Sequence, residues 1–128
     1  MQKPQEKQQT INEVLDNLTP AQKETTEKLR QLIKNTVPQA VEMVKQGKIV
    51  YKLENKDFAW ISNYQGHVDV ELAMGSRLSS DLLKRRGVAE PNPHNRHIEA
   101  DNYELIEPEL TRLLCEAANL TLECAALE

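Results

Sequence analysis

The first third of the chain carries hydrophobic residues at helical spacing. The segment Thr10-Ile11-Asn12-Glu13 has the composition of a capping box, in which the first and last side chains satisfy free backbone groups at a helix start. The segment Thr19-Pro20-Ala21-Gln22 has the composition of a second capping box, with proline at the first helical position. The apolar stripes that follow are Ile11, Val14, Leu15 and Leu18 in the first helix, and Ala21, Leu29, Leu32 and Ile33 in the second. We therefore expect two consecutive helices, the second ending before Val37-Pro38.

The middle of the chain changes to the period of β-strands. Residues 49–53 and 58–61 are rich in β-branched and aromatic side chains, and residues 67–74 alternate between polar and apolar positions. The segment Tyr64-Gln65-Gly66-His67 resembles a tight turn, so the strands on either side of it should form an antiparallel hairpin. Residues 41–44 should add a short strand before them.

The last third contains two further helices and one more strand. Ser79-Ser80-Asp81 should cap a short helix through Arg86, which the next glycine closes. Residues 88–95 form a loop, residues 96–100 a strand, and Pro108 opens the final helix. Its apolar positions are Leu110, Leu113, Leu114, Ala117 and Ala118. The whole is an α+β fold: an antiparallel sheet of about five strands with two N-terminal helices, a short middle helix and a C-terminal helix, in two layers.

The hairpin register divides the side chains between two faces of the sheet. If Tyr64 pairs with His67, the next opposed pairs are Ser62 with Asp69, Trp60 with Glu71, and Phe58 with Ala73, and all eight side chains point to the same face. The opposite row consists of Val68, Val70, Leu72 and Met74, and it should meet the helices.

The first of these faces is a candidate docking surface for a protein or a small ligand. It carries the only tryptophan and the only phenylalanine of the chain. Its proposed binding residues are Phe58, Trp60, Tyr64, His67, Asp69 and Glu71. An aromatic and polar face of this kind suits recognition. Alternatively a helix covers this face, or the register slips by one residue and exchanges the two faces.

Two further kinds of site deserve comparison. His67, Asp69 and Glu71 offer metal-ligand atoms, but alternate positions on a strand lie about 7 Å apart, so the set more simply forms the solvated side of an amphipathic strand. A basic segment supplies a candidate anion site of Arg77, Lys84, Arg85, Arg86, Arg96 and His97, which would suit the phosphate or carboxylate ligand of an anion-binding sensor or enzyme. Ser79 and Ser80 would add donors at a helix start. Alternatively the basic residues compensate the negative end of that helix.

Composition narrows the class of protein. The chain has 128 residues and a net charge of −4, which does not favour nucleic-acid binding. It lacks the motifs of serine hydrolases, P-loop enzymes and zinc proteases, so we expect a binding protein and no enzyme. Polar N-terminal residues and the absence of a long apolar run predict a cytoplasmic protein without membrane association. As a separate expectation, the protein is a monomer or a weak homodimer. We expect a flexible tail over residues 1–9, one domain over 10–126, and a tag remnant at 127–128.

The two cysteines fit this assignment. Cys115 and Cys124 fall in one predicted helix, about 13 Å apart along its axis, which is too far for an intramolecular disulfide. We expect both to be buried or half-buried thiols, in keeping with a reducing compartment.

Several short sequence segments, taken in their order along the chain, resemble the YdhG-like family of domains of unknown function. A bacterial frataxin-like intracellular iron chaperone belongs to this family. The segments are the helix over residues 11–18 followed by Thr19-Pro20, Leu29-Arg30-x-x-Ile33, Val37-Pro38, Tyr51-x-Leu53, Phe58-Ala59-Trp60-Ile61, Gly66-His67-Val68-x-Val70, Gly75-Ser76-Arg77-Leu78, Leu82-Leu83-x-x-x-Gly87 and Arg96-His97-Ile98. The resemblance runs from about residue 10 to 120. It implies a frataxin-like two-layer sandwich, in agreement with the order of elements above.

The same resemblance implies an alternative function, intracellular iron binding, with iron as the bound group. Frataxin-type iron sites depend on acidic residues crowded on an early helix and the adjacent strand edge. The early acidic residues here are Glu13, Asp16, Glu24 and Glu27, and they are interspersed with Lys23, Lys28, Arg30 and Lys34. This mixture lowers the local negative potential that would concentrate a cation.

Overall fold

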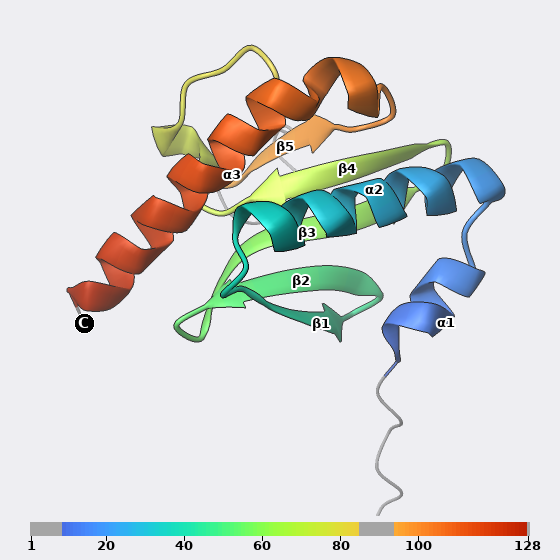
Figure 1. Ribbon diagram of the computed structural model, residues 1–128, viewed down its shortest axis with the longest axis horizontal. Coiled ribbons are helices and arrows are strands. Elements are labelled where there is room, and N and C mark those ends of the chain that lie inside the picture. The colour runs from blue at the N-terminus through green and yellow to red at the C-terminus, as the bar shows by residue number, and fades with distance from the viewer. Residues whose placement is uncertain (1–8, 85–93, 128) are drawn as a thin grey trace, which may run out of the picture.

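The computed structural model describes residues 9–84 and 94–127. Its elements are, in chain order, α1 (Ile11–Asp16), α2 (Pro20–Thr36), β1 (Val41–Lys45), β2 (Lys48–Leu53), β3 (Lys56–Tyr64), β4 (His67–Leu72), the 3-10 helix η1 (Gly75–Arg77), β5 (Arg96–Glu99) and α3 (Tyr103–Ala126). The five strands form one antiparallel sheet in the order β1-β2-β3-β4-β5 (Figure 1). The α+β class and the antiparallel sheet are as predicted.

Both predicted capping boxes form. The hydroxyl of Thr10 accepts from the amide of Glu13, whose carboxylate receives the Thr10 amide in return. Thr19 and Gln22 exchange the same pair of bonds at the start of α2, where Pro20 occupies the first turn. These local bonds explain why both helices begin where the sequence indicates.

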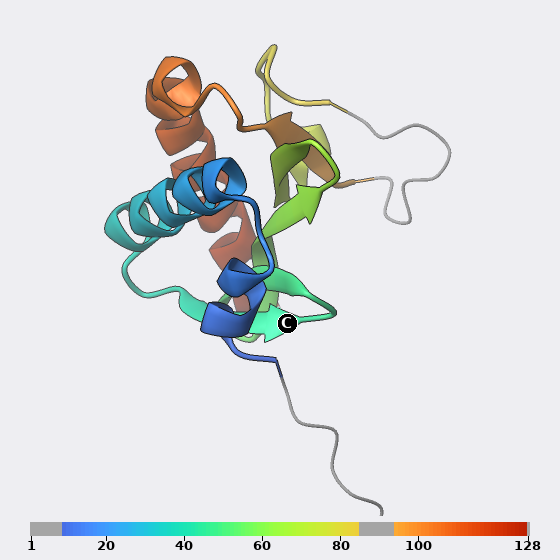
Figure 2. The ribbon, with the colours of Figure 1, turned by 90° about the vertical axis from the view of Figure 1, so that its right-hand side faces the viewer.

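Helices α2 and α3 cover one face of the sheet (Figures 1 and 2). Val68, Val70 and Leu72 of β4 are fully buried in the core beneath them, as predicted. Met74 lies beyond the strand in a left-handed conformation, with φ of 61°, and its sulfur accepts from Cys124 of α3 at 3.6 Å. The helix side of the hairpin was therefore correctly assigned.

A polar cluster joins β1 to α2 on this helix side of the sheet. Arg30 donates two bonds to the carboxylate of Glu42, at 3.0 and 2.9 Å, and Lys34 lies 3.3 Å from it. The hydroxyl of Tyr51, which is opposite Glu42 in the sheet, donates at 2.6 Å. Burial raises the pKa of Glu42, but the bonds from Arg30 and Tyr51 outweigh it and hold that pKa at about 2. Burial, and then the bond to Glu42, raise the pKa of Tyr51.

The hairpin register continues to Trp60 as predicted, but a β-bulge displaces Phe58. Tyr51 pairs with Ala59 and Lys52 pairs with Asp57, which leaves Phe58 as the extra residue of β3. A bulge redirects the side chain of the inserted residue. Phe58 is fully buried in the hydrophobic cluster between the sheet and the helices, so its assignment to the docking face was wrong.

The segment after η1 also differs from the prediction. Residues 79–84 are not helical, and Lys84 exchanges two backbone hydrogen bonds of 2.7 Å with His97 of β5. The hydroxyl of Ser80 accepts from the amide of Leu82 within its own turn and donates to Glu109 of α3 at 3.1 Å. Ser80, one of the predicted caps, is therefore bound within a turn and to α3, and Arg86 lies outside the described residues.

The final helix begins five residues earlier than predicted. The carbonyl of Asn102 accepts from the amides of Leu105 and Ile106, which closes the first turn ahead of Pro108. Pro108 is exposed inside α3, where it removes one backbone hydrogen bond and its ring crowds the preceding turn. The burial of Ile106 in the core favours this earlier start.

Candidate functional site

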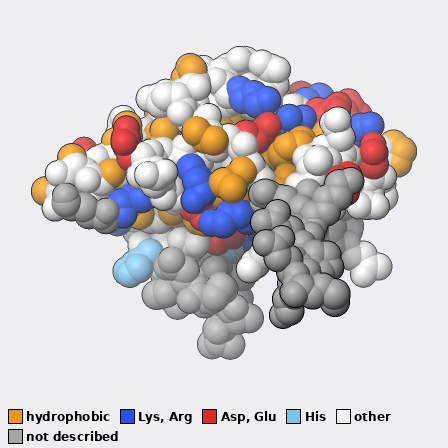
Figure 3. All heavy atoms as spheres, turned by 90° about the horizontal axis from the view of Figure 1, so that it is seen from below, with side chains coloured by type: hydrophobic (Ala, Val, Ile, Leu, Met, Phe, Trp, Pro, Cys, Tyr) orange, Lys and Arg blue, Asp and Glu red, His pale blue; other side chains and the backbone are white. Residues whose placement is uncertain are grey.

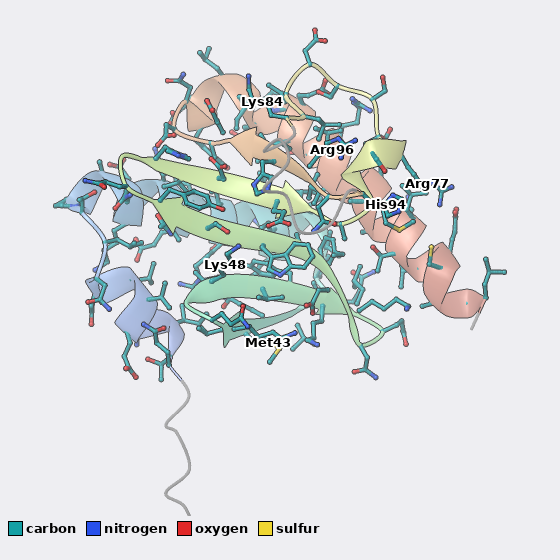
Figure 4. All side chains as sticks on the ribbon, turned by 180° about the vertical axis from the view of Figure 1, so that it is seen from behind. Met43, Lys48, Arg77, Lys84, His94 and Arg96 are labelled. Carbon is teal, nitrogen blue, oxygen red and sulfur yellow. The ribbon has the colours of Figure 1, made fainter. Side chains whose placement is uncertain are left out.

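The sheet face opposite the helices carries the polar and aromatic row that the hairpin register predicts. Tyr64 pairs with His67, Ser62 with Asp69, and Trp60 with Glu71. The next strand adds to this row, because Glu71 of β4 also lies opposite His97 of β5. His97 was predicted in the separate anion group, and the sheet brings it to this face instead. Figure 4 views this side of the sheet, with Lys48 on β2 and Arg96 on β5.

The charged members of the row are more buried than an open docking surface requires. Asp69 is fully buried, and Glu71 and His97 are 7% and 4% exposed. Trp60, Tyr64 and His67 are half-buried. Because β4 lies between β3 and β5, side chains of both neighbours flank Asp69 and Glu71. The prediction that these two carboxylates are presented at the surface was therefore wrong.

Imidazole and carboxylate groups alternate along this row. Nδ1 of His67 lies 2.9 Å from Oδ1 of Asp69, and Nδ1 of His97 lies 3.6 Å from Oδ2 of the same residue. Nε2 of His97 is 4.0 Å from Oε1 of Glu71. The side-chain amide of Asn95 donates to Oε2 of Glu71 at 2.6 Å, and the rings of Tyr64 and His67 stack at the hairpin end. Contacts among side chains from three strands hold the row in place.

A cavity of about 440 Å³ opens beside this row. It is lined by Lys45, Gln46, Lys48, Asp57, Trp60 and Glu71. These residues come from β1, β2, β3, β4 and the turn between β1 and β2, so only the assembled sheet creates the cavity. An aromatic ring surrounded by a few charged groups is a common composition of a small-ligand site.

The charges of the cavity are balanced. Lys45 and Lys52 bind the two oxygens of Asp57, at 3.0 and 3.2 Å, and Nζ of Lys48 lies 3.8 Å from Oε1 of Glu71. Figure 3 shows the same mixture on a wider surface, where basic, acidic and hydrophobic side chains are interspersed. Such a surface does not select for a ligand of one charge sign.

The predicted anion group is divided between several places. Arg77 lies in η1 and lines a cavity of about 270 Å³ with Ser76 and His94. Arg96 donates to the carbonyl of its neighbour Asn95 at 2.8 Å, while Lys84 and His97 share the backbone bridge. Arg85 and Arg86 lie outside the described residues. Figure 4 shows Arg77, His94 and Arg96 at one end of the sheet.

Sequence reasoning missed a further cavity, which we call the Gln22 cavity, and most residues of the cavity beside Trp60. A cavity of about 550 Å³ lies between the α1–α2 corner and the β3–β4 turn, and its polar lining includes Gln22, Asn63 and Asp101. Gln22 donates to the carbonyl of Tyr64 at 2.8 Å and joins its two sides. In the cavity beside Trp60, the most informative residue that was missed is Lys48. Val50 pairs with Trp60, and Lys48, two positions earlier in the strand, points to the same face, so the β2–β3 register would have identified it.

Within residues 9–84 and 94–127, no group of three or more His, Cys, Asp or Glu side chains has an arrangement that could hold a metal ion. In the same two ranges, no helix has both the length and the apolar character needed to cross a bilayer.

Comparison with known proteins defines the family but no activity. The chain resembles the crystal structure of YdhG, a protein of the DUF1801 family from Bacillus subtilis, with a TM-score of 0.56 and 19% identity over 77% of this chain and 82% of that one. At this identity the likeness concerns the fold, and it confirms the YdhG-like resemblance. No curated protein matches. The model of the domain of unknown function DUF5655 matches residues 11–121, and the chain therefore belongs to that family.

Proposed function

We propose that this protein is a non-enzymatic binding domain for a small molecule, which it takes in the cavity beside Trp60. One observation carries the proposal. Among the described residues, buried polar side chains concentrate on this sheet face: Ser62, Asp69, Glu71 and His97 point to it, and Asn95 donates to Glu71.

The cost of this arrangement supports a functional reading. Burying a charged or polar group costs free energy unless it is well paired, and apolar replacements of similar volume are often equally stable or more so. Fold stability alone therefore does not account for a row of carboxylates and imidazoles in one sheet.

Binding is preferred to catalysis here because the row opens on a cavity of modest size with an aromatic ring. A half-buried tryptophan gives a planar apolar contact, and the charged groups around it orient a ligand. No specific observation favours the alternative functions. The carbonyl of Asn95 already engages Arg96, and the hydroxyl of Ser80 is directed to Glu109, which weakens the anion hypothesis.

The experiment uses Trp60 as a reporter. Because it is the only tryptophan of the chain, the single indole N–H signal in a ¹H–¹⁵N spectrum reports on this cavity. Small molecules of neutral, anionic, cationic and zwitterionic classes are titrated into the full chain. We expect at least one class to shift the indole signal together with signals of β2 and β4.

Replacement of Trp60 and Tyr64 by alanine should abolish that binding while the dispersed spectrum of a folded domain is retained. Unfolding of the double variant would identify the rings as core, in which case the milder Trp60→Phe variant gives the binding comparison. Titrations in which every responding class shifts only signals around Gln22 and Asn63 would refute the proposal and move the site to the Gln22 cavity.

A further inference from the structure

The cavity beside Trp60 presents both charge signs, and its two carboxylates, Asp57 and Glu71, differ in how closely lysines approach them. Oδ2 of Asp57 accepts from Lys45 at 3.0 Å, and Nζ of Lys52 lies 3.2 Å from Oδ1, which has no hydrogen-bond partner within the described residues. Lys48 and Glu71 are 3.8 Å apart, beyond hydrogen-bond distance. Asp57 is thus approached closely by two lysines, whereas Glu71 is 3.8 Å from Lys48, and we call the Lys48–Glu71 pair open.

One carboxylate oxygen of Glu71 is available to accept a hydrogen bond from a ligand. Its Oε2 receives the amide of Asn95 at 2.6 Å, while Oε1 has only the contacts to Lys48 at 3.8 Å and to His97 at 4.0 Å within the described part of the chain. Asn95 thus fixes the carboxylate in orientation and leaves Oε1 toward the cavity, which Glu71 lines. Oε1 is an acceptor for a donor of positive charge.

Lys48 offers the opposite half of the same arrangement. Its side chain is 40% exposed, against 9% for that of Glu71, so the ammonium lies toward the mouth and the carboxylate toward the floor. A ligand of negative charge alone would meet the carboxylates of Glu71 and Asp57, and one of positive charge alone would meet Lys48 and Lys45. Either would leave a charge of the cavity opposed by a like charge.

We infer that the cavity binds a zwitterionic ligand of the α-amino-acid type, an inference that rests on the proposed function. The ligand carboxylate pairs with Lys48, its ammonium group donates to Oε1 of Glu71, and its side chain lies against the ring of Trp60. An amino acid carries its two charges a few ångströms apart, which matches the 3.8 Å spacing of the open pair. The four charges then alternate in sign, and each has an opposite neighbour.

A matched set of probes separates this inference from the proposed function. L-Phenylalanine has both charges, N-acetyl-L-phenylalanine has only the negative one, and L-phenylalaninamide has only the positive one. Each is titrated into the full chain while the indole signal of Trp60 is followed. We expect the zwitterion to bind about tenfold or more tightly than either singly charged form, because each lacks one charge-assisted contact.

Two variants test the assigned partners. Lys48→Met should lose selectivity against phenylalaninamide, and Glu71→Gln should lose selectivity against the acetylated form, while Lys23→Met on the exposed surface of α2 leaves the ranking unchanged. Melting curves of each variant establish that the fold is retained, and the surface position of Lys48 keeps the test available should Glu71→Gln unfold.

Three results overturn the inference. Equal affinities for the three forms would mean that the ring alone is recognised, so that the binding function stands without the zwitterion. Preference for a ligand of a single charge sign would have the same meaning. No shift of the indole by any phenylalanine form, in a protein whose indole does respond to another class, would also refute the amino-acid ligand and leave the proposed function intact.

Discussion

Glu42 and Glu71 are largely buried carboxylates of the same sheet, yet their surroundings differ. Glu42 faces the helices and receives short bonds from two groups, the guanidinium of Arg30 and the hydroxyl of Tyr51, with Lys34 at 3.3 Å. Glu71 faces the other way; within the described residues it receives one short bond, from the neutral amide of Asn95, and the nearest lysine lies at 3.8 Å.

This difference in hydrogen bonding identifies Glu42 as part of a structural ion pair and Glu71 as a carboxylate with one oxygen still available as an acceptor. At Glu42 each oxygen is engaged by a group of the protein, and the low pKa of about 2 expresses that engagement. Oε1 of Glu71 lines a cavity and still has capacity for a donor. Two carboxylates with similar burial therefore have different expected roles, and substitutions can compare them directly.

The largest effect is expected from neutralising the two carboxylates in turn. Glu42→Gln should lower the free energy of unfolding by about 2 kcal/mol, because the half-buried guanidinium of Arg30 loses its charged partner. Glu71→Gln should cost less than about 1 kcal/mol, since a glutamine oxygen still accepts from Asn95. Urea unfolding at neutral pH measures both. Equal losses for the two variants would contradict the comparison.

Acid should weaken the contribution of Glu42 to the free energy of unfolding within a defined pH range. The pKa of Glu42 is lowered from 4.5 in the unfolded chain to about 2 in the fold, so between these values the unfolded state binds more protons. The contribution of Glu42 to the free energy of unfolding is therefore complete at pH values above its unfolded-state pKa, and it is lost as the pH falls toward 2. The stability of wild type and of Glu42→Gln, measured against pH, should converge in this range; parallel curves would exclude the assignment.

Removal of one hydroxyl should have an intermediate effect. Tyr51→Phe deletes the 2.6 Å bond to Glu42 and leaves the ring in place, which should cost about 1 kcal/mol in urea unfolding. Tyr103→Phe is the control, because the ring of Tyr103 lies beside Lys28 and packs against the core, and its hydroxyl takes no part in the Glu42 cluster. A loss at Tyr103 as large as that at Tyr51 would show that the bond to Glu42 is not responsible.

The smallest effect on stability is expected at Lys48, where the effect on binding should be the largest. Lys48→Met removes a contact of 3.8 Å at a side chain that is 40% exposed, so the free energy of unfolding should change by less than about 0.5 kcal/mol. Ligand titration by the Trp60 indole signal should nevertheless show weakened binding. A strongly destabilised variant with unchanged affinity would assign Lys48 a structural role.

Much of the fold was predictable because the signals are local. The capping boxes at Thr10 and Thr19 involve residues three positions apart, and both form. The Tyr64–His67 turn sets the register of the hairpin, and alternation then places Val68 and Val70 in the core. In each case the information lies within a few residues of the chain, so no knowledge of distant contacts is needed.

The errors occurred where a distant contact decides the outcome. The bulge at Phe58 accommodates the pairing of β2 with β3 and turns an aromatic ring into the core. Lys84 pairs with His97 of β5 in place of a helical turn, and the burial of Ile106 extends α3 beyond Pro108. Propensity and capping cannot report such contacts, because their free energy comes from residues far away in the sequence.

The sequence by itself therefore determined the α+β class, the two capped helices, the hairpin register and which row of β4 meets the helices. Only the tertiary structure decided that Asp69 and Glu71 are buried, that His97 joins them, and that Lys48 opposes Glu71 across a cavity. The physical reason is that a strand's pattern specifies which face a side chain takes. The neighbours it finds on that face, and hence its burial and charge balance, depend on strand order and on side chains contributed by the rest of the sheet.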